Sequence, residues 1–202
     1  MKTLLPILIL FISFIGTAQS KKKITKEIKT YQTEANEEFG NPETTILDSL
    51  DLISFKELEF YPIDLKYRVK AKLTYTPNEK PFLMKTSTTR LPEYVKYAIA
   101  EFTLLGKDLK LNIYKPTKAI EKPEDEYVFI PITDLTSGDG SYGGGRYLEV
   151  DIPTKETMII DFNLLYNPYC AYSHRYSCPI PPKENDLLIR IEAGVKDYKG
   201  HH

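Results

Sequence analysis

Two stretches of this sequence concentrate residue types that bind or transform small molecules. In the first, half of the ten glycines lie between Gly138 and Gly145, directly before Arg146. Glycine-rich loops let a ligand approach backbone N–H groups that can bind an anion, and a guanidinium suits carboxylates and phosphates. The loop lacks the spacing of a phosphate loop or a dinucleotide fingerprint. It is therefore either a ligand-binding loop or a plain hairpin loop, with Arg146 in an ion pair to Glu149 or Asp151.

The second stretch runs from Tyr166 to Pro182 and holds four tyrosines, four prolines and both cysteines. Proline restricts the unfolded chain and tyrosine supplies rigid, amphipathic surface, so this composition predicts an ordered loop. Together the two stretches predict one pocket for a small polar or anionic molecule. The residues expected to contact this ligand are Tyr142, Gly143, Gly145, Arg146, Asn163, Asn167 and Asn185.

Carboxylates near these stretches are candidates for acid–base chemistry. Asp161 interrupts a strongly apolar run, so it must face water, accept hydrogen bonds from loop backbone or be functional. A hydrolase would use Asp161 or Glu184 as the general base and Arg146 as an electrophilic clamp. Asp134 and Glu149 are further candidates. The alternative for all four is a surface or loop-capping carboxylate.

Cys170 and Cys178 are the two cysteines of the chain, and in an exported protein they predict a disulfide. Two alternatives use His174, which lies midway between them. It could complete a zinc site, although the spacing matches no standard zinc knuckle, or it could activate a cysteine nucleophile. Because neither stretch carries a cofactor motif, we expect no cofactor and no metal.

The N-terminus indicates export. Lys2 precedes an apolar run from Leu4 to Ile15, and the small residues up to Ala18 fit a signal peptidase, so residues 1–18 are predicted to be a cleaved signal peptide. The run is too short to span a bilayer. Residues 19–202 should therefore form a single domain with no integral membrane segment, in the periplasm or outside the cell.

Composition narrows the class of protein. With 42% apolar and 27% charged residues the chain is too hydrophobic for disorder, and a net charge of −1 gives no basic face for nucleic acid. A length of 202 residues is sufficient for one good core. The charged stretch 121–126 is too short to separate two domains, and His201 and His202 should be a solvated tail.

The elements that must position these residues follow from hydrophobic periodicity. Apolar residues from Lys21 to Phe39 recur at helical steps and predict a helix that Gly40 ends, with a short second helix within 44–55. From Tyr67 the period changes to two, with a tight hairpin turn at 106–108, which predicts an antiparallel β-sandwich or barrel of about eight strands carrying one or two N-terminal helices. The expected strands are 67–75, 82–88, 95–105, 109–114, 127–132, 146–152, 158–164 and 187–193.

Three motifs resemble a known family. They are Tyr-Gly-Gly-Gly-Arg-Tyr-Leu-Glu at 142–149, Asp-Phe-Asn at 161–163, and Asn-Pro-x-Cys-Ala-x6-Cys-Pro-x-Pro-Pro-x-Glu-Asn at 167–185. The sequence resembles the bacterial and archaeal family called domain of unknown function 1684, from the early helix to Gly194. The family name implies no activity, substrate or cofactor. The resemblance does imply which positions matter: Arg68, Tyr142, Gly143, Gly145, Arg146, Asp161, Asn163, Asn167, Cys170, Cys178, Pro179, Glu184 and Asn185, without His174.

The resemblance also leaves open that the two cysteines are buried small hydrophobes near a site. Three functions remain from the sequence. A ligand-binding domain requires the two loops to line one pocket. A hydrolase requires a carboxylate beside Arg146 with an oxygen free for substrate. A structural protein of the cell envelope requires only that the motifs tie loops to the sheet.

Overall fold

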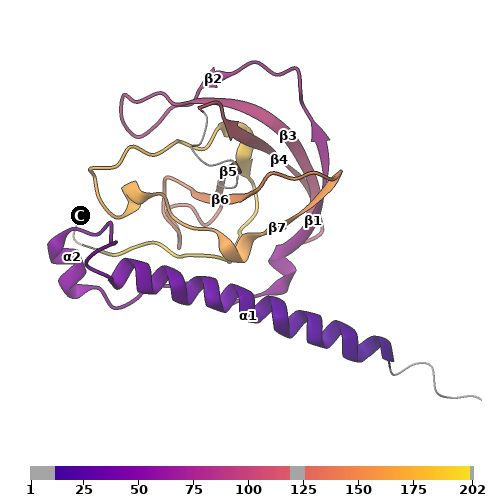
Figure 1. Ribbon diagram of the computed structural model, residues 1–202, viewed down its shortest axis with the longest axis horizontal. Coiled ribbons are helices and arrows are strands. Elements are labelled where there is room, and N and C mark those ends of the chain that lie inside the picture. The colour runs from indigo at the N-terminus through magenta and orange to yellow at the C-terminus, as the bar shows by residue number, and fades with distance from the viewer. Residues whose placement is uncertain (1–11, 119–125, 201–202) are drawn as a thin grey trace, which may run out of the picture.

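The computed structural model describes residues 12–118 and 126–200. In this part of the chain, two helices lead into an eight-stranded sheet (Figure 1). The start of the predicted signal peptide, most of the charged stretch 121–126 and the predicted tail at His201 and His202 lie outside the described residues. None of the described helices combines the length and apolar character that crossing a membrane needs.

The predicted N-terminal helix is present as α1, Ile12–Gly40, and it begins earlier than the periodicity indicated. Ile28 is buried, and Tyr31, Ala35 and Phe39 follow it at helical steps as partly buried residues. This stripe faces the body of the protein, and α1 lies along one side of the sheet with its N-terminal end projecting beyond it (Figure 1). The second helix, α2, is confined to Ser49–Ser54.

The sheet confirms the prediction of a mainly β, antiparallel fold with N-terminal helices. Its path runs β6-β5-β4-β3-β1-β7, while β2 pairs with β3 and β8 runs parallel to β5. The sheet curls into a half-barrel (Figure 1). The strands are β1 Arg68–Tyr75, β2 Phe82–Leu83, β3 Glu93–Leu104, β4 Lys107–Pro116, β5 Tyr127–Asp134, β6 Arg146–Asp151, β7 Thr157–Asp161 and β8 Asp186–Leu187.

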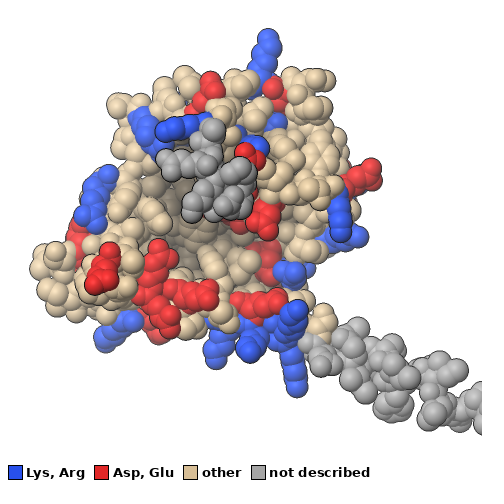
Figure 2. Space-filling model, in the orientation of Figure 1, with Lys and Arg blue, Asp and Glu red and all other residues tan. Residues whose placement is uncertain are grey.

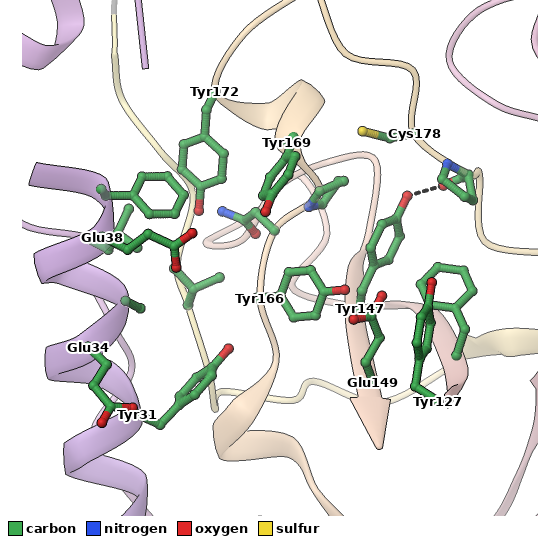
Figure 3. A pocket seen from close by; sticks show the side chains of 18 of the residues that line it. Tyr31, Glu34, Glu38, Tyr127, Tyr147, Glu149, Tyr166, Tyr169, Tyr172 and Cys178 are labelled. Atoms are coloured by element: carbon green, nitrogen blue, oxygen red, sulfur yellow. Dashed lines mark hydrogen bonds between the residues drawn. The ribbon is translucent and has the colours of Figure 1, made fainter. Parts of the chain in front are cut away.

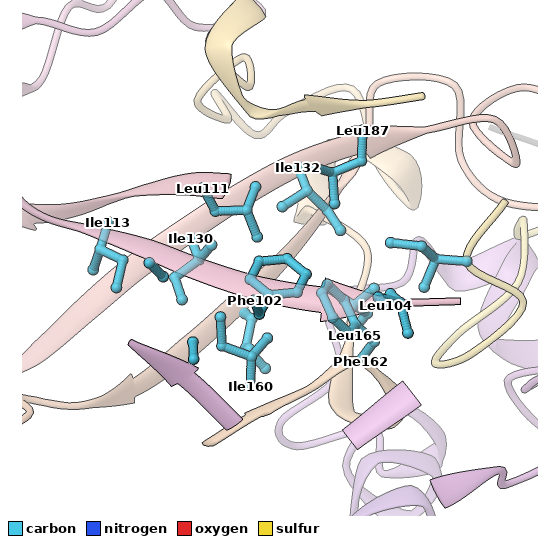
Figure 4. Packing of buried hydrophobic residues seen from close by; sticks show 14 of the residues in the cluster. Phe102, Leu104, Leu111, Ile113, Ile130, Ile132, Ile160, Phe162, Leu165 and Leu187 are labelled. Carbon is cyan, nitrogen blue, oxygen red and sulfur yellow. The ribbon is translucent and has the colours of Figure 1, made fainter. Parts of the chain in front are cut away.

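Strand alternation places the main core on the concave face of this sheet. Phe102 on β3, Ile130 on β5 and Ile160 on β7 meet there (Figure 4). The β3–β4 hairpin turns at Leu105 and Gly106, both with positive φ, one residue before the predicted turn. The intervening residues of β5 and β6 point to the opposite face, where a second cluster contains Phe129 and Tyr147.

Two predicted strands are much shorter than expected. Of 82–88 only Phe82–Leu83 is strand, and of 187–193 only Leu187 is, at the end of β8. Residues 187–195 nevertheless bury every second side chain, as an extended segment should. They do not pair with a neighbouring strand over this length. The carbonyls of Ile191, Ala193 and Val195 instead accept hydrogen bonds from the Arg146 side chain. A buried arginine therefore takes the place of a neighbouring strand.

Candidate functional site

Arg146 does not face a ligand site. Its side chain has no solvent exposure, and Nη2 donates to Asp134 Oδ2 at 2.8 Å and to Thr136 Oγ1 at 3.2 Å. The predicted ion-pair partners, Glu149 and Asp151, lie on the other face of β6, so that alternative is wrong as well. The expected ligand contact through Arg146 is corrected to a structural ion pair with Asp134.

Asp134 has no oxygen left for a substrate. Oδ2 accepts from Arg146, while Oδ1 accepts from the backbone N–H groups of Thr136 at 2.8 Å and Ile191 at 3.1 Å. The hydrolase hypothesis needs a carboxylate beside Arg146 with one oxygen free. Since both oxygens of Asp134 are engaged in the core, the geometry gives that hypothesis no support.

The two predicted catalytic carboxylates also lie elsewhere. Asp161 is buried, pairs with Arg68 at 2.8 Å, and caps the short helix η3, Phe162–Leu164, by accepting from the Asn163 N–H. Glu184 is exposed on the short helix η5, Lys183–Asn185. Neither residue approaches Arg146 or lines the cavity described below. Asp161 is thus a loop-capping carboxylate, which was the alternative interpretation.

Two of the predicted ligand-binding asparagines serve the backbone. Asn163 bonds both the N–H and the carbonyl of Asp64, at 3.0 and 3.1 Å. Asn185 lies between β4 and β5, accepting from the Asn112 N–H at 2.8 Å and donating to the carbonyls of Asn112 and Pro131, each at 2.9 Å. They satisfy buried backbone groups that lack a strand partner. Their predicted role in ligand contact is corrected accordingly.

The glycine loop lies beside the tyrosine-rich loop, as the ligand hypothesis requires. The Tyr142 hydroxyl is 3.7 Å from Cys170 Sγ. Gly145, however, has φ +87° and a Cβ there would come within 2.4 Å of the Ile132 carbonyl oxygen, so the turn itself requires glycine. Tyr142, Gly143 and Gly145 do not line the cavity. The predicted contacts of these three residues with a ligand are therefore not supported.

A cavity of about 610 Å³ opens on the other side of the tyrosine-rich loop, between that loop, α1 and the sheet (Figure 3). Its volume lies within the range of small-molecule sites. A hollow is visible on the corresponding face of the molecule (Figure 2). Tyrosine dominates the walls, whose polar and aromatic residues include Tyr31, Glu34, Glu38, Arg90, Tyr94, Tyr127, Phe129, Tyr147, Glu149, Tyr166, Asn167, Tyr169, Tyr172 and Cys178.

The cavity walls follow from the two periodicities in the sequence. Tyr147 and Glu149 alternate along β6 with Leu148 and Val150, which pack on the core. Helical steps in α1 bring its aromatic and acidic residues to the same cavity (Figure 3). Tyr166 pairs with Tyr147 through two backbone hydrogen bonds of 2.8 and 3.0 Å, which fixes the tyrosine-rich loop against β6.

Glu149 is the acidic group at the β6 wall. It remains accessible to solvent through the cavity, yet the protein around it raises its pKa because burial disfavours the charge, and a hydrogen bond with Tyr166 partly offsets this. Burial and then Glu149 raise the pKa of both Tyr31 and Tyr127 to about 12. These phenols therefore stay protonated and present neutral rings to the cavity.

Asn167 is the predicted ligand-binding residue that does line the cavity. Its side chain is 2% exposed, and Nδ2 donates to the Lys196 carbonyl at 2.9 Å. This bond fixes the orientation of the amide, and it leaves Oδ1 buried without a hydrogen-bond partner among the described residues. An unpaired buried acceptor costs about 1–3 kcal/mol, so its presence at a cavity wall is informative.

Both cysteines are free thiols in the structure, so the expected disulfide is not formed there. The Cys170 N–H donates to Cys178 Sγ at 3.1 Å, and the Cys178 thiol, then Tyr142, lowers the pKa of Cys170 to about 6 against the effect of burial. Bonding in the oxidised protein stays a prediction. Within residues 12–118 and 126–200, no three His, Cys, Asp or Glu side chains are grouped to hold a metal ion.

Comparison with known proteins identifies the family. Residues 53–196 match the sequence model described as a protein of unknown function, DUF1684. The chain belongs to the DUF1684 family. The match starts after α1, so the resemblance predicted from the early helix onward is confirmed from residue 53. A search of curated proteins gives no match.

A solved structure supports the same architecture. The solution NMR structure of an uncharacterised protein from Haloarcula marismortui is 27% identical, with a TM-score of 0.69. The alignment covers 88% of this chain and 96% of that one. The half-barrel is therefore found in a second protein, whose description names no activity.

The part of the site that α1 contributes was not predicted from the sequence. Tyr31, Glu34 and Glu38 share one helical face, but their periodicity alone does not show which surface they cover. Glu149 was considered as an acid–base candidate and not as a ligand residue. Alternation along β6 was the available signal, since it places Glu149 with Tyr147 on the face opposite Leu148.

Proposed function

We propose that this protein is a binding domain for a small molecule with an aromatic or otherwise apolar body, and that the ligand occupies the cavity between α1 and β6. The observation that carries the proposal is the cavity of about 610 Å³, in whose walls tyrosine is the most frequent residue and the exposed surface is mostly apolar. Such concave, mostly apolar sites are the usual form of a small-molecule pocket.

The charges around the cavity change the ligand class expected from the sequence. Among the described residues that line it, Glu34, Glu38 and Glu149 are acidic and Arg90 is the basic one. Arg146, on which the anionic ligand depended, is enclosed in the core. A small anion is therefore disfavoured, and the polar part of the ligand should be neutral or basic.

A fragment screen by thermal shift tests the binding function, with one variant that fills the cavity. Ala35 lines the cavity from α1, so Ala35→Phe should block it, while Thr30 is exposed on the same helix and Thr30→Phe serves as the matched control. A fragment at about 100 times its Kd should raise the Tm of wild type and Thr30→Phe by about 5–10 °C. Failure of every fragment, or equal shifts in Ala35→Phe, would contradict the proposal.

We also propose that the protein is exported and cleaved after Ala18. Cleavage there would shorten α1 and leave its cavity-lining residues from Tyr31 onward in place. Intact mass of the protein recovered from the periplasm or culture fluid tests this. The expected N-terminal residue is Gln19, and a chain that still begins at Met1 would refute cleavage.

A further inference from the structure

We infer that the ligand of this cavity is an organic cation, a protonated amine attached to an aromatic body. This inference rests on the proposed binding function and specifies its ligand class. Three independent features of the cavity support it: the sign of the lining charges, the tyrosine rings around Glu149, and the unpaired acceptor on Asn167.

The lining charges favour a positive ligand. Glu34 and Glu38 on α1 and Glu149 on β6 occupy facing walls of the cavity (Figure 3). Among the described lining residues the cation is Arg90, which is held against the tyrosine-rich loop, where Nε donates to Oγ of Ser177, another lining residue, at 3.2 Å. Figure 2 shows acidic side chains at the α1 edge of the hollow. An ammonium group in the cavity would thus meet carboxylates on both sides.

The tyrosines give that ammonium group an aromatic surrounding. Tyrosines from separate parts of the fold line the cavity together with Glu149: Tyr31 on α1, Tyr94 on β3, Tyr127 on β5, and Tyr166 and Tyr169 in the tyrosine-rich loop. Of the labelled rings, Tyr127, Tyr147 and Tyr166 lie nearest to Glu149 (Figure 3). Aromatic faces attract cations through their negative π-surfaces, and cages of this composition are a recurrent way to bind amines and ammonium groups.

Asn167 favours a polar group that carries hydrogens, as an amine or a hydroxyl does. Its Nδ2 donates to the Lys196 carbonyl, which leaves Oδ1 buried and without a partner among the described residues, on a side chain that lines the cavity. A carboxylate or a neutral carbonyl on the ligand offers no donor to this oxygen. A protonated primary amine offers three, so one group can satisfy Asn167 and the nearby negative charge.

Three probes of similar shape test the inference by isothermal titration calorimetry. Phenethylamine is cationic, 2-phenylethanol is neutral and phenylacetate is anionic. We expect phenethylamine to bind about tenfold more tightly than 2-phenylethanol, with phenylacetate the weakest. Glu149→Gln should raise the Kd of the amine about tenfold and leave that of the alcohol unchanged. Glu101→Gln, an equal charge change at an exposed position of β3 outside the cavity, should alter neither.

The outcomes separate the ligand class from the binding function. Equal affinity for amine and alcohol, or an amine Kd that Glu149→Gln leaves unchanged, would overturn the inference that the ligand is a cation. The proposal of a small-molecule site would stand. The ligand class alone would also be overturned if phenethylamine does not bind but screened fragments do, and Ala35→Phe abolishes their binding. If no fragment and none of the three probes binds, both the ligand class and the binding function would be overturned.

Discussion

Replacing Arg146 with methionine removes the charge that Asp134 requires in the core. Both side chains are almost fully buried, at 0% and 1% exposure. Methionine keeps much of the volume but breaks the bonds to Asp134, Thr136 and the carbonyls of the 191–195 segment. Breaking a buried pair in this way costs about 3–5 kcal/mol, against a total stability of about 5–15 kcal/mol for a typical domain.

Urea unfolding followed by tyrosine fluorescence measures this loss, because the chain contains 15 tyrosines and no tryptophan. With an m-value of about 2 kcal/mol/M, the midpoint should fall by about 1.5–2.5 M. Arg190→Met breaks an exposed pair with Asp139 and should cost less than about 1 kcal/mol.

A second substitution distinguishes the ion pair from mere packing. Adding Asp134→Asn to Arg146→Met removes the stranded charge and keeps Oδ1 as the acceptor for the Thr136 and Ile191 N–H groups, so the double variant should recover part of the lost stability. A loss below about 1 kcal/mol in Arg146→Met would refute the proposed burial cost. A double variant no more stable than the single one would refute the role of Asp134.

Three further substitutions test other parts of the structure. Burial raises the pKa of Glu149 in the folded state, so its charge opposes folding above that pKa. Glu149→Gln should therefore be more stable than wild type at pH 7, and the difference in stability should shrink as the pH falls. A difference that grows in acid would contradict this. Asn185→Ala leaves backbone groups of Asn112 and Pro131 unpaired and should lose about 2 kcal/mol or more in urea unfolding. Gly145→Ala should lose more than about 1 kcal/mol and Gly143→Ala much less, since only the first has positive φ and a close backbone neighbour; equal losses would rule out this account of the turn.

Local periodicity was sufficient to predict the sheet and α1. It could not predict that residues 187–195 form so little strand, because their partner is a side chain from β6. The pair between Arg146 and Asp134 is equally invisible to spacing along one strand. Alternation does place Arg146 with Leu148 on the core face, which would have excluded Glu149 as its partner.

Several residues of the family motifs have a structural role and do not line the cavity. Arg146, Asn163 and Asn185 bond backbone groups in segments that lack strand partners. Asn167 is the exception, since it combines a bond to the Lys196 carbonyl with an unpaired acceptor at the cavity. The tyrosine-rich loop lines the cavity, but the opposite wall comes from α1, whose position depends on tertiary packing, and not from the glycine loop.

The most direct test of the account is to map where phenethylamine binds by two-dimensional NMR of the labelled protein. We expect the largest chemical-shift changes at Tyr31, Glu149, Tyr166 and Asn167, around the cavity between α1 and β6. Changes centred on the glycine loop at 138–145, or no saturable changes at all, would contradict it.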